Sequence, residues 1–339
     1  VRGCAVNPPR LERRRPSCCI RRMRKPVILH AVPLPAAQVA HMAQSYEVHG
    51  PLARSVPEAI PPAARAARAL ITLGGFPTDA AMIAALPQLG LICCYGTGYE
   101  GVDRAAARDR GIIVTHAGDS NSTAVAEFAM GLIIATARRL VQGDRKVRAG
   151  GWTSLGIDRM PMTPGLSGKR LGIYGMGTIG RKIAARAEPF EMEIGYHNRT
   201  RRDDVGYAYL DSLPALAEWS DVLVVAARAG AENRRAVDAE VLRALGPDGV
   251  LVNIARGIIV DEPALCAALE GGVIAGAGLD VYADEPHVPE RLRALENAVL
   301  TPHMAAVALT AQRAQRGVLE ANLAAFFAGQ PVRFRAPVP

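Results

Sequence analysis

The chain has 339 residues, a formal net charge of +8 and a pI of about 9.4. A pI this high is typical of nucleic-acid-binding proteins, so the position of the charge has to be examined. Residues 1–25 carry nine basic side chains and one acidic side chain, a net charge of +8, so the other 314 residues balance at 31 basic and 31 acidic groups. A body without net charge predicts no nucleic-acid partner.

Composition also limits the class of protein. Half of the residues are apolar, which is enough for a sizeable core in one or two domains. No uncharged apolar run reaches about 18 residues, so we expect no membrane span. The six cysteines include two adjacent pairs and show no C-x-x-C spacing, so we predict neither a disulfide framework nor a metal site, and a cytoplasmic protein.

Residues 1–25 differ from the rest in being rich in arginine, proline and cysteine. They lack the apolar stretch of a secretory signal, and Pro8, Pro9 and Pro16 argue against an amphipathic helix. Met23 immediately precedes the first strand-like run. We therefore predict a disordered tail or a start site assigned too far upstream, with a transit peptide or a basic binding arm as the alternatives.

Strand-like apolar runs then alternate with helical stretches, a pattern typical of a parallel α/β sheet. The first series predicts strands at 26–32, 69–73, 89–95 and 112–115, and helices at 35–44, 78–86 and 101–110. A long helix is expected over 122–149, after the capping residues Ser120 and Asn121. Because 124–137 is apolar on almost every face, this helix should be buried on more than one side, at an interface or inside one domain.

A second α/β series follows a loop rich in glycine, proline and methionine at 150–168. It predicts strands at 170–174, 192–196, 221–226, 249–254, 273–280 and 297–300, and helices at 178–188, 213–219, 238–245, 261–270 and 305–328. Two α/β series joined by a helix and a loop predict two domains with a cleft between them.

The segment GMGTIG at 175–180 matches the dinucleotide pattern G-x-G-x-x-G, between a predicted strand and a predicted helix. Gly175 permits the tight turn, Gly177 lets the backbone approach a pyrophosphate, and Gly180 allows close helix–strand packing. Thr178 and Ile179 begin the helix, whose first amide groups are unpaired donors for phosphate oxygens. We therefore predict a nicotinamide dinucleotide site.

The end of the next predicted strand bears on the choice of cofactor. An NAD site places a carboxylate about 20 residues after the glycines, to hold the ribose hydroxyls. Here Asn198 stands at that place, followed by Arg199, Thr200, Arg201 and Arg202. A guanidinium and a hydroxyl can bind a 2′-phosphate that a carboxylate would repel, so NADP is predicted over NAD. The alternative is a solvated loop whose arginines are balanced by nearby aspartates.

Three later segments carry residue types suited to reduction of a 2-oxoacid: LVNIARGIIVDEPAL (251–265), AGLDVYADEP (277–286) and LTPHMAA (300–306). Arg256 can grip a carboxylate through its planar fork. His303 is an acid/base group near neutral pH, and a hydrogen bond from its imidazole to Glu285 would favour the protonated form of His303. Each residue also has an ordinary structural explanation when it is taken alone.

Taken together and in this order, the segments resemble the D-isomer-specific 2-hydroxyacid dehydrogenases, particularly the glyoxylate/hydroxypyruvate reductase branch. The resemblance covers nearly all of 26–330, including the loop YGTGYEGVD (95–103), the helix segment at 123–139 and RAGGW (148–152). It implies an α/β fold with a Rossmann-type cofactor domain at 118–302 and a discontinuous flavodoxin-like substrate domain at 26–117 and 303–339.

The resemblance also implies the roles of particular residues. Arg256, Glu285 and His303 would be catalytic, and the backbone of Gly96, Thr97 and Gly98 would hold the substrate carboxylate with Arg256. Ala255 and Asp280 would lie at the cofactor site, Asp280 in a supporting structural position. Trp152 would reach the active site of a neighbouring subunit in a homodimer formed through the 122–149 helix, although a core position is the alternative for a lone tryptophan.

Two departures from the family pattern concern the pocket. Arg228, in AARAG (226–230), stands where the family usually has a proline, and Ala305 and Ala306 replace a glycine–serine pair. The first could alter nucleotide affinity and the second could narrow the pocket.

Three functions are compatible with these observations. The first is NADPH-dependent reduction of a small 2-oxoacid such as glyoxylate or hydroxypyruvate. The second is an NAD-linked dehydrogenase of a bulkier 2-hydroxyacid, and the third is a nucleotide-sensing, corepressor-like binding protein. A phosphoglycerate dehydrogenase with a C-terminal regulatory domain is not expected, because the sequence has no room for that domain after the closing helix.

Overall fold

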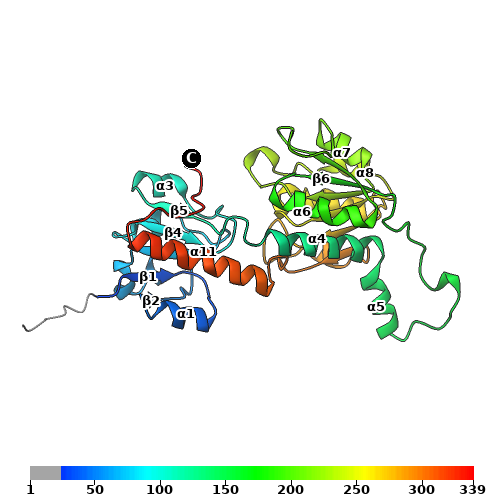
Figure 1. Cartoon of the computed structure of the whole chain (residues 1–339). Helices are drawn as coiled ribbons and strands as arrows, with labels where there is room; N and C mark the ends of the chain where they lie inside the picture. The colour runs from blue at the N-terminus through cyan, green and yellow to red at the C-terminus, as the bar shows by residue number, and fades with distance from the viewer. Residues whose placement is uncertain (1–23) are drawn as a thin grey trace, which may run out of the picture.

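The computed structural model describes residues 24–339, which form two parallel β-sheets side by side (Figure 1). The predicted tail therefore falls outside the described residues except for Arg24 and Lys25, which lead into the first strand. None of the helices within residues 24–339 is long and apolar enough to cross a membrane. No group of three or more histidine, cysteine or carboxylate side chains suited to a metal ion occurs in this part of the chain.

The first sheet has five strands in the order β2-β1-β3-β4-β5, all parallel. They are β1 (Val27–His30), β2 (Glu47–His49), β3 (Ala69–Thr72), β4 (Leu91–Cys94) and β5 (Ile113–Thr115). This is the flavodoxin-like strand order that the resemblance implied. Strand β2 was not predicted, because three partly exposed residues at a sheet edge give no apolar run.

Helices cover both faces of this sheet. They are α1 (Ala36–Met42), α2 (Ala80–Ala84), α3 (Arg104–Asp109) and α11 (Leu309–Phe327), with short 3₁₀ helices η1 (Pro57–Ala59) and η2 (Pro62–Ala66). Helix α11 comes from the far end of the chain, and its Leu319 and Leu323 pack against Ile28 and Leu91. The last residues then return along β5, where the Ala336 amide donates to the carbonyl of Val114.

The second sheet has seven parallel strands in the order β12-β11-β10-β9-β6-β7-β8. They are β6 (Arg170–Tyr174), β7 (Glu193–His197), β8 (Ala208–Tyr209), β9 (Val222–Val225), β10 (Val250–Asn253), β11 (Gly276–Leu279) and β12 (Ala298–Leu300). The order is that of a Rossmann fold with one additional strand, and the chain changes direction across the sheet between β6 and β9. The crevice at such a point is where open α/β sheets bind their ligands.

Alternating apolar residues bury both faces of this sheet. Val222 and Val224 of β9 pack toward α4 and α6, whereas Leu223 and Val225 pack toward α7 and α8. The helices are α6 (Thr178–Ala187), α7 (Leu213–Trp219), α8 (Ala239–Leu245), α9 (Glu262–Glu270) and α10 (Glu290–Arg293), with 3₁₀ helices η4 (Glu188–Phe190), η5 (Ala231–Asn233) and η6 (Gly257–Ile259). The two-residue strand β8 and the single-turn helix α10 were not predicted.

The expected single helix over 122–149 is wrong, because the chain forms α4 (Ser122–Ala137) and α5 (Leu140–Arg148). Helix α4 ends where its apolar run ends, and Arg139 then adopts a left-handed conformation with φ 51°. The buried side of α4 packs on β10, β11 and α6, and its end contacts α11. Helix α5 is polar and projects from the body with the 150–168 segment, joined by η3 (Ile157–Arg159) (Figure 1).

Candidate active site

The glycine turn joins β6 to α6 at the crevice of the seven-stranded sheet. Gly175 has φ 110°, and a side chain there would overlap the backbone of Ala226 and Ala227 after β9. A side chain at Gly180 would overlap the carbonyl of Gly175, so the helix starts directly against the turn. A Cβ at Gly177, in contrast, would meet no atom within 4 Å. The turn is therefore closed on the protein side and open where a pyrophosphate would lie.

The ten-residue helix α6 begins at Thr178 without a side-chain cap. Its first amide groups, including those of Thr178 and Ile179, are therefore available as donors for an anion. The Asn198 Oδ1 atom accepts a hydrogen bond from the Met176 amide at 2.7 Å, which ties the end of β7 to the turn. These features fit a dinucleotide: a cradle that a side chain at Gly177 would fill, next to an uncapped helix start.

The arginines after Asn198 have separate surroundings. Arg199 is 86% exposed, and its Nη1 atom lies 3.5 Å from Glu232 Oε1 of η5, which follows β9. Arg201 lies over the ring of Tyr209 at 5.9 Å, and Arg202 Nε lies 3.7 Å from Asp204. Thr200 is exposed. Of the three arginines, only Arg199 pairs with a residue beside the nucleotide crevice. Arg202 pairs with Asp204 of its own loop.

Arg256 follows β10 in a turn shaped by a buried side chain. The Asn253 amide accepts from the Ala255 N–H and donates to the carbonyl of Arg256, both at 3.1 Å. Gly257 packs so closely on the backbone of Tyr282 that any side chain would overlap it. The Arg256 guanidinium donates from Nη1 to the Ala255 carbonyl and from Nε to Glu100 Oε1, both at 2.7 Å. Arg256 is thus held at the carboxyl end of its strand.

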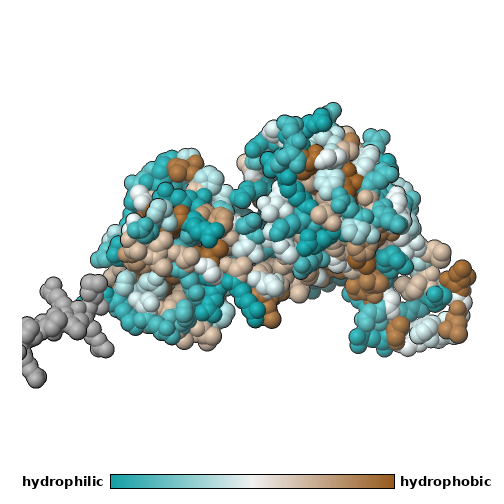
Figure 2. Space-filling view, in the orientation of Figure 1, coloured by the Kyte–Doolittle hydropathy of each residue, from teal (hydrophilic) through white to brown (hydrophobic). Residues whose placement is uncertain are grey.

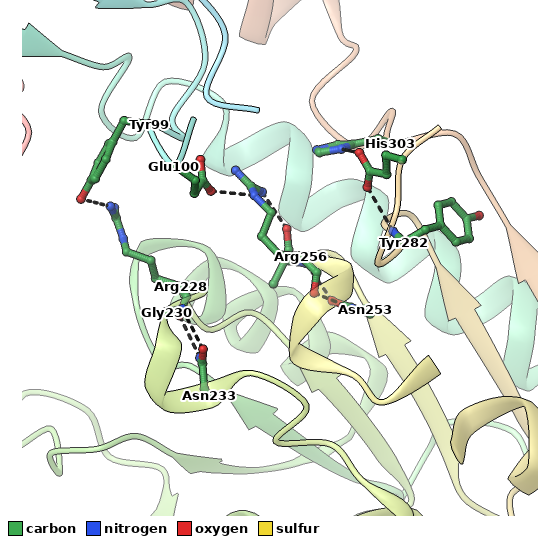
Figure 3. Close-up of polar contacts among 11 residues, drawn as sticks. Tyr99, Glu100, Arg228, Gly230, Asn233, Asn253, Arg256, Tyr282 and His303 are labelled. Atoms are coloured by element: carbon green, nitrogen blue, oxygen red, sulfur yellow. Dashed lines mark hydrogen bonds and ion pairs between the residues drawn. The ribbon is translucent and has the colours of Figure 1, made fainter. Parts of the chain in front are cut away.

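The loop after β4 meets Arg256 across the cleft. A side chain at Gly98 would overlap Glu100 and would lie 2.5 Å from Arg256 Nη2. Gly96 fixes the same loop to β5 by accepting a hydrogen bond from the Ala117 amide at 2.8 Å, and Thr97 between the two glycines is partly exposed. The structure therefore brings the predicted 96–98 loop and Arg256 together. Figure 3 shows Glu100, which follows this loop, bound to Arg256.

His303 and Glu285 form a hydrogen-bonded pair, and the charge of Arg256 acts on Glu285. His303 Nδ1 lies 2.7 Å from Glu285 Oε2, and Glu285 Oε1 accepts from the Tyr282 amide at 3.0 Å. Burial alone would raise the pKa of Glu285, but the hydrogen bonds from His303 and Tyr282 and the charge of Arg256 outweigh it, so the pKa is lowered. Glu285 is therefore an ionised partner for the imidazole.

Asp280 supports the segment that carries His303. Its side chain belongs to a residue that is 1% exposed, and its Oδ1 accepts from the Thr301 hydroxyl at 2.6 Å and the Met304 amide at 2.8 Å. Its Oδ2 accepts from the Ala305 amide at 2.8 Å. Both oxygens are bound to the chain itself, so Asp280 sits in the supporting position rather than open to the cofactor crevice.

A pocket of about 410 Å³ lies between the two sheets. Its walls come from the 99–105 loop of the first sheet and from Arg228 and Ala229 after β9 of the second, with Pro339 at its edge. The Arg228 guanidinium contacts the Tyr99 hydroxyl and lies 5.0 Å from the centre of the Tyr99 ring. A second pocket of about 360 Å³ lies at the opposite, amino ends of β9 and β10.

Three residues of this site were not found from the sequence: Glu100, Tyr99 and Glu232. Glu100 stood inside the quoted loop 95–103, but its partner Arg256 is 156 residues away, and no local spacing connects them. Arg228 was noted only as a departure from the family pattern. Trp152 is 54% exposed, so the alternative of a core tryptophan is wrong for this chain; its indole N–H donates to the Ser154 carbonyl at 2.8 Å.

Comparison with known proteins identifies the family of the chain. The family model described as "D-isomer specific 2-hydroxyacid dehydrogenase, NAD binding domain" matches residues 130–305. A glyoxylate/hydroxypyruvate reductase of Arabidopsis thaliana is 39% identical over 82% of this chain and 85% of its own length. A hydroxyphenylpyruvate reductase of Plectranthus scutellarioides is 40% identical over 79% of this chain and 85% of its own length.

A solved structure shares both the fold and the sequence. The NADPH-dependent glyoxylate/hydroxypyruvate reductase of Sinorhizobium meliloti, crystallised with NADP and malonate, superposes with a TM-score of 0.86 at 36% identity, covering 92% of this chain and 97% of that one. The family model thus covers an NAD-binding domain, and the solved structure shares the overall fold. The chain therefore belongs to the D-isomer-specific 2-hydroxyacid dehydrogenase family, in its glyoxylate/hydroxypyruvate reductase branch, and is an NAD(P)-dependent oxidoreductase.

Proposed function

We propose that this protein reduces a small 2-oxoacid, glyoxylate or hydroxypyruvate, to the 2-hydroxyacid with NADPH. The observation that carries the proposal is that Arg256, the hydrogen-bonded pair of Glu285 and His303, and the glycine turn all follow parallel strands of the seven-stranded sheet, at its carboxyl edge. Such a site offers a cation for the carboxylate and a proton donor for the carbonyl oxygen. The nicotinamide cofactor, when bound, supplies the hydride for the carbonyl carbon.

The chain's own residues divide the remaining work. Arg256 binds the substrate carboxylate and, with the amides of the 96–98 loop, fixes the orientation of the acid. The second ring nitrogen of His303, Nε2, gives its proton to the carbonyl oxygen, which becomes the hydroxyl of the product. Glu285 holds Nδ1 and stabilises the charged imidazole, so that a proton is ready on the opposite nitrogen.

The preference for NADPH rests on the end of β7. Gly175, Gly177 and the first amides of α6 would hold the pyrophosphate, and Arg199 with Thr200 would hold the 2′-phosphate. Support comes from the uncharged Asn198 at the position where an NAD site has a carboxylate, and from the Sinorhizobium meliloti relative, which is described as NADPH-dependent.

The domain division and the homodimer are part of the proposal. We assign 26–117 and 303–339 to substrate binding, supported by α11 packing on the five-stranded sheet, and 118–302 to the cofactor. A homodimer is supported by exposed apolar side chains on α5 and the 150–168 segment, where Figure 2 shows an apolar surface. The unpaired, buried cysteines Cys93, Cys94 and Cys266 suit the reducing cytoplasm.

A bulkier 2-oxoacid is the second candidate substrate, because one relative is named a hydroxyphenylpyruvate reductase. Steady-state assays with purified protein decide between them, using NADPH or NADH with glyoxylate, hydroxypyruvate and hydroxyphenylpyruvate. We expect the highest kcat/KM for a small acid with NADPH. Preference for the aromatic acid would favour the second candidate, preference for NADH would refute the role of Arg199, and no turnover of any acid would refute the proposed reaction.

A further inference from the structure

Glu100 lies between two arginines that reach across the cleft. Its Oε1 atom accepts from Arg256 Nε at 2.7 Å, and the neighbouring Tyr99 is contacted by Arg228 (Figure 3). Glu100 and Tyr99 belong to the loop after β4 in the first sheet, whereas the arginines follow β10 and β9 in the second. Both contacts therefore join the two halves of the protein at the substrate cleft.

The pair with Glu100 limits what Arg256 can hold. A guanidinium grips a carboxylate best with two neighbouring N–H groups. In Arg256, Nε is bound to Glu100 and Nη1 to the Ala255 carbonyl, and only Nη2 lies free of a hydrogen bond, against Gly98. The grip through Nε and Nη2 therefore requires the bond to Glu100 to break. The grip through Nη1 and Nη2 can use the second N–H of Nη1, but it brings a second carboxylate to a guanidinium that Glu100 already holds. The Ala255 carbonyl belongs to the turn fixed by Asn253, whereas Glu100 is a side chain that can rotate.

A second arginine, Arg228, lies close to Glu100 and can pair with it after displacement from Arg256. Burial alone would raise the pKa of Glu100, but attraction to Arg256 and also to Arg228 outweighs burial and lowers it. Arg228 is thus already close enough to act on the Glu100 carboxylate, and its cation–π contact with Tyr99 keeps it beside the loop. The Glu100 side chain is 42% exposed, so a displaced carboxylate meets water as well as Arg228, and the second arginine favours its displacement.

We propose that the substrate carboxylate displaces Glu100 from Arg256 and that Arg228 receives Glu100 in exchange. The inference rests on the proposed role of Arg256 in binding the substrate. Glu100 and Arg228 then determine which ligands bind. Arg256 stays paired with Glu100 until an anion competes for it, and only a ligand with its own carboxylate can replace Glu100 there. Neither residue touches the reacting carbonyl, so both act through Arg256 as positioning residues.

The test is a double-mutant cycle of Glu100→Gln and Arg228→Ala. Oxamate, a carboxylate that the enzyme cannot reduce, is titrated by calorimetry into each nucleotide-loaded protein, and KM and kcat for glyoxylate are measured in parallel. We expect Glu100→Gln to tighten oxamate binding and lower KM about 3- to 10-fold, with a smaller change in kcat. Arg228→Ala should weaken oxamate binding and raise KM for glyoxylate by a similar factor. In the Glu100→Gln background, Arg228→Ala should have almost no effect, because position 100 then has no carboxylate for Arg228 to bind.

Matched controls are Glu240→Gln and Arg234→Ala, which remove the same charges from exposed positions outside the cleft. Weaker oxamate binding by Glu100→Gln would overturn the proposal, because Glu100 would then assist Arg256 rather than compete with the ligand. An equal effect of Arg228→Ala in both backgrounds, or equal oxamate affinity in all four proteins, would overturn it as well. Calorimetry reports these outcomes even if glyoxylate is not turned over, which separates this inference from the proposed reaction.

Discussion

Arg199 Nη1 lies 3.5 Å from Glu232 Oε1, so the arginine proposed to bind a 2′-phosphate has a carboxylate of its own chain beside it. Both side chains are well exposed, at 86% and 60%, and the attraction is therefore weak and screened by salt. Glu232 also places a negative charge next to the site where the phosphate would bind. The same carboxylate would thus oppose the preference for NADPH that we propose for Arg199.

This pair gives a prediction on cofactor choice. Glu232→Gln should lower KM for NADPH about 2- to 5-fold and leave KM for NADH nearly unchanged, because only the phosphate is repelled. Arg199→Ala should raise KM for NADPH about tenfold through loss of a charge-assisted bond. Arg202→Ala is the matched control, since Arg202 pairs with Asp204. Equal shifts for both nucleotides would contradict the assignment, and all effects should shrink at high salt.

Arg256 gives the second prediction, on substrate binding. Arg256→Ala should lower kcat/KM for glyoxylate about 10²- to 10³-fold, because the carboxylate loses its paired cation. Arg256→Lys should recover only part of this loss, since an ammonium keeps the charge without the planar fork. Arg235→Ala, which removes an arginine paired with Asp261, is the control. Steady-state kinetics measure all three, and near-normal turnover by Arg256→Ala would rule out the role assigned to it.

The third prediction concerns pH. Because the pKa of Glu285 is lowered below its ordinary value of 4.5, the carboxylate is fully ionised above that value. The carboxylate that His303 contacts is therefore present at neutral pH, and its stabilising effect is lost as the pH falls through the lowered pKa of Glu285. In Glu285→Gln, the carboxylate beside the imidazole is absent at every pH, so kcat should be lower throughout and the decline that protonation of Glu285 causes at low pH should be missing from the profile.

The measurement is the pH profile of kcat for glyoxylate reduction. His303→Ala should lose about 10²- to 10⁴-fold at all pH values, because the proton donor is absent. Glu262→Gln is the matched control: its carboxylate accepts a hydrogen bond from the Ala283 amide on the same segment. A low-pH decline that remains in Glu285→Gln, or one that is also missing in Glu262→Gln, would show that Glu285 acts only as a structural support.

The features that could be predicted from the sequence are those with local causes. The turn at Gly175 was recognised because steric requirements of a tight turn fall on residues within one hexapeptide. The fully buried strands β3, β4, β9 and β10 were found because each is apolar throughout or in all but its last residue. The end of α4 was missed because its last turn and the first of α5 both favour a helix, and only the left-handed Arg139 separates them.

The remaining features depend on contacts between distant parts of the chain. Glu100 meets Arg256, and Tyr99 meets Arg228, only after two sheets have folded and come together. Strand β8 forms because Ala208 and Tyr209 pair with the free edge of β7. Two residues are too few to show the apolar pattern of a strand. Charge on a side chain identifies a candidate for binding an anion, but its partner in the folded chain is set by topology.

The last prediction concerns the proposed homodimer. Helix α5 and the segment after it expose apolar side chains that a monomer would leave in water, among them Trp152, Leu155 at 85% and Ile157 at 80% exposure. The double variant Leu155→Asp with Ile157→Asp should shift the protein from dimer to monomer, because a charge buried without a partner opposes association by several kcal/mol, on the order of 2–5.

Light scattering after size-exclusion chromatography measures the mass of each protein. Val338→Asp is the matched control, because Val338 is also exposed, at 72%, but lies at the other end of the chain beside the first sheet. A dimer that persists in the double variant would place the interface elsewhere. A monomer that keeps the glyoxylate activity of the dimer would show that Trp152 of a neighbouring subunit is not needed in the active site, whereas a monomer with a raised KM would support its contribution.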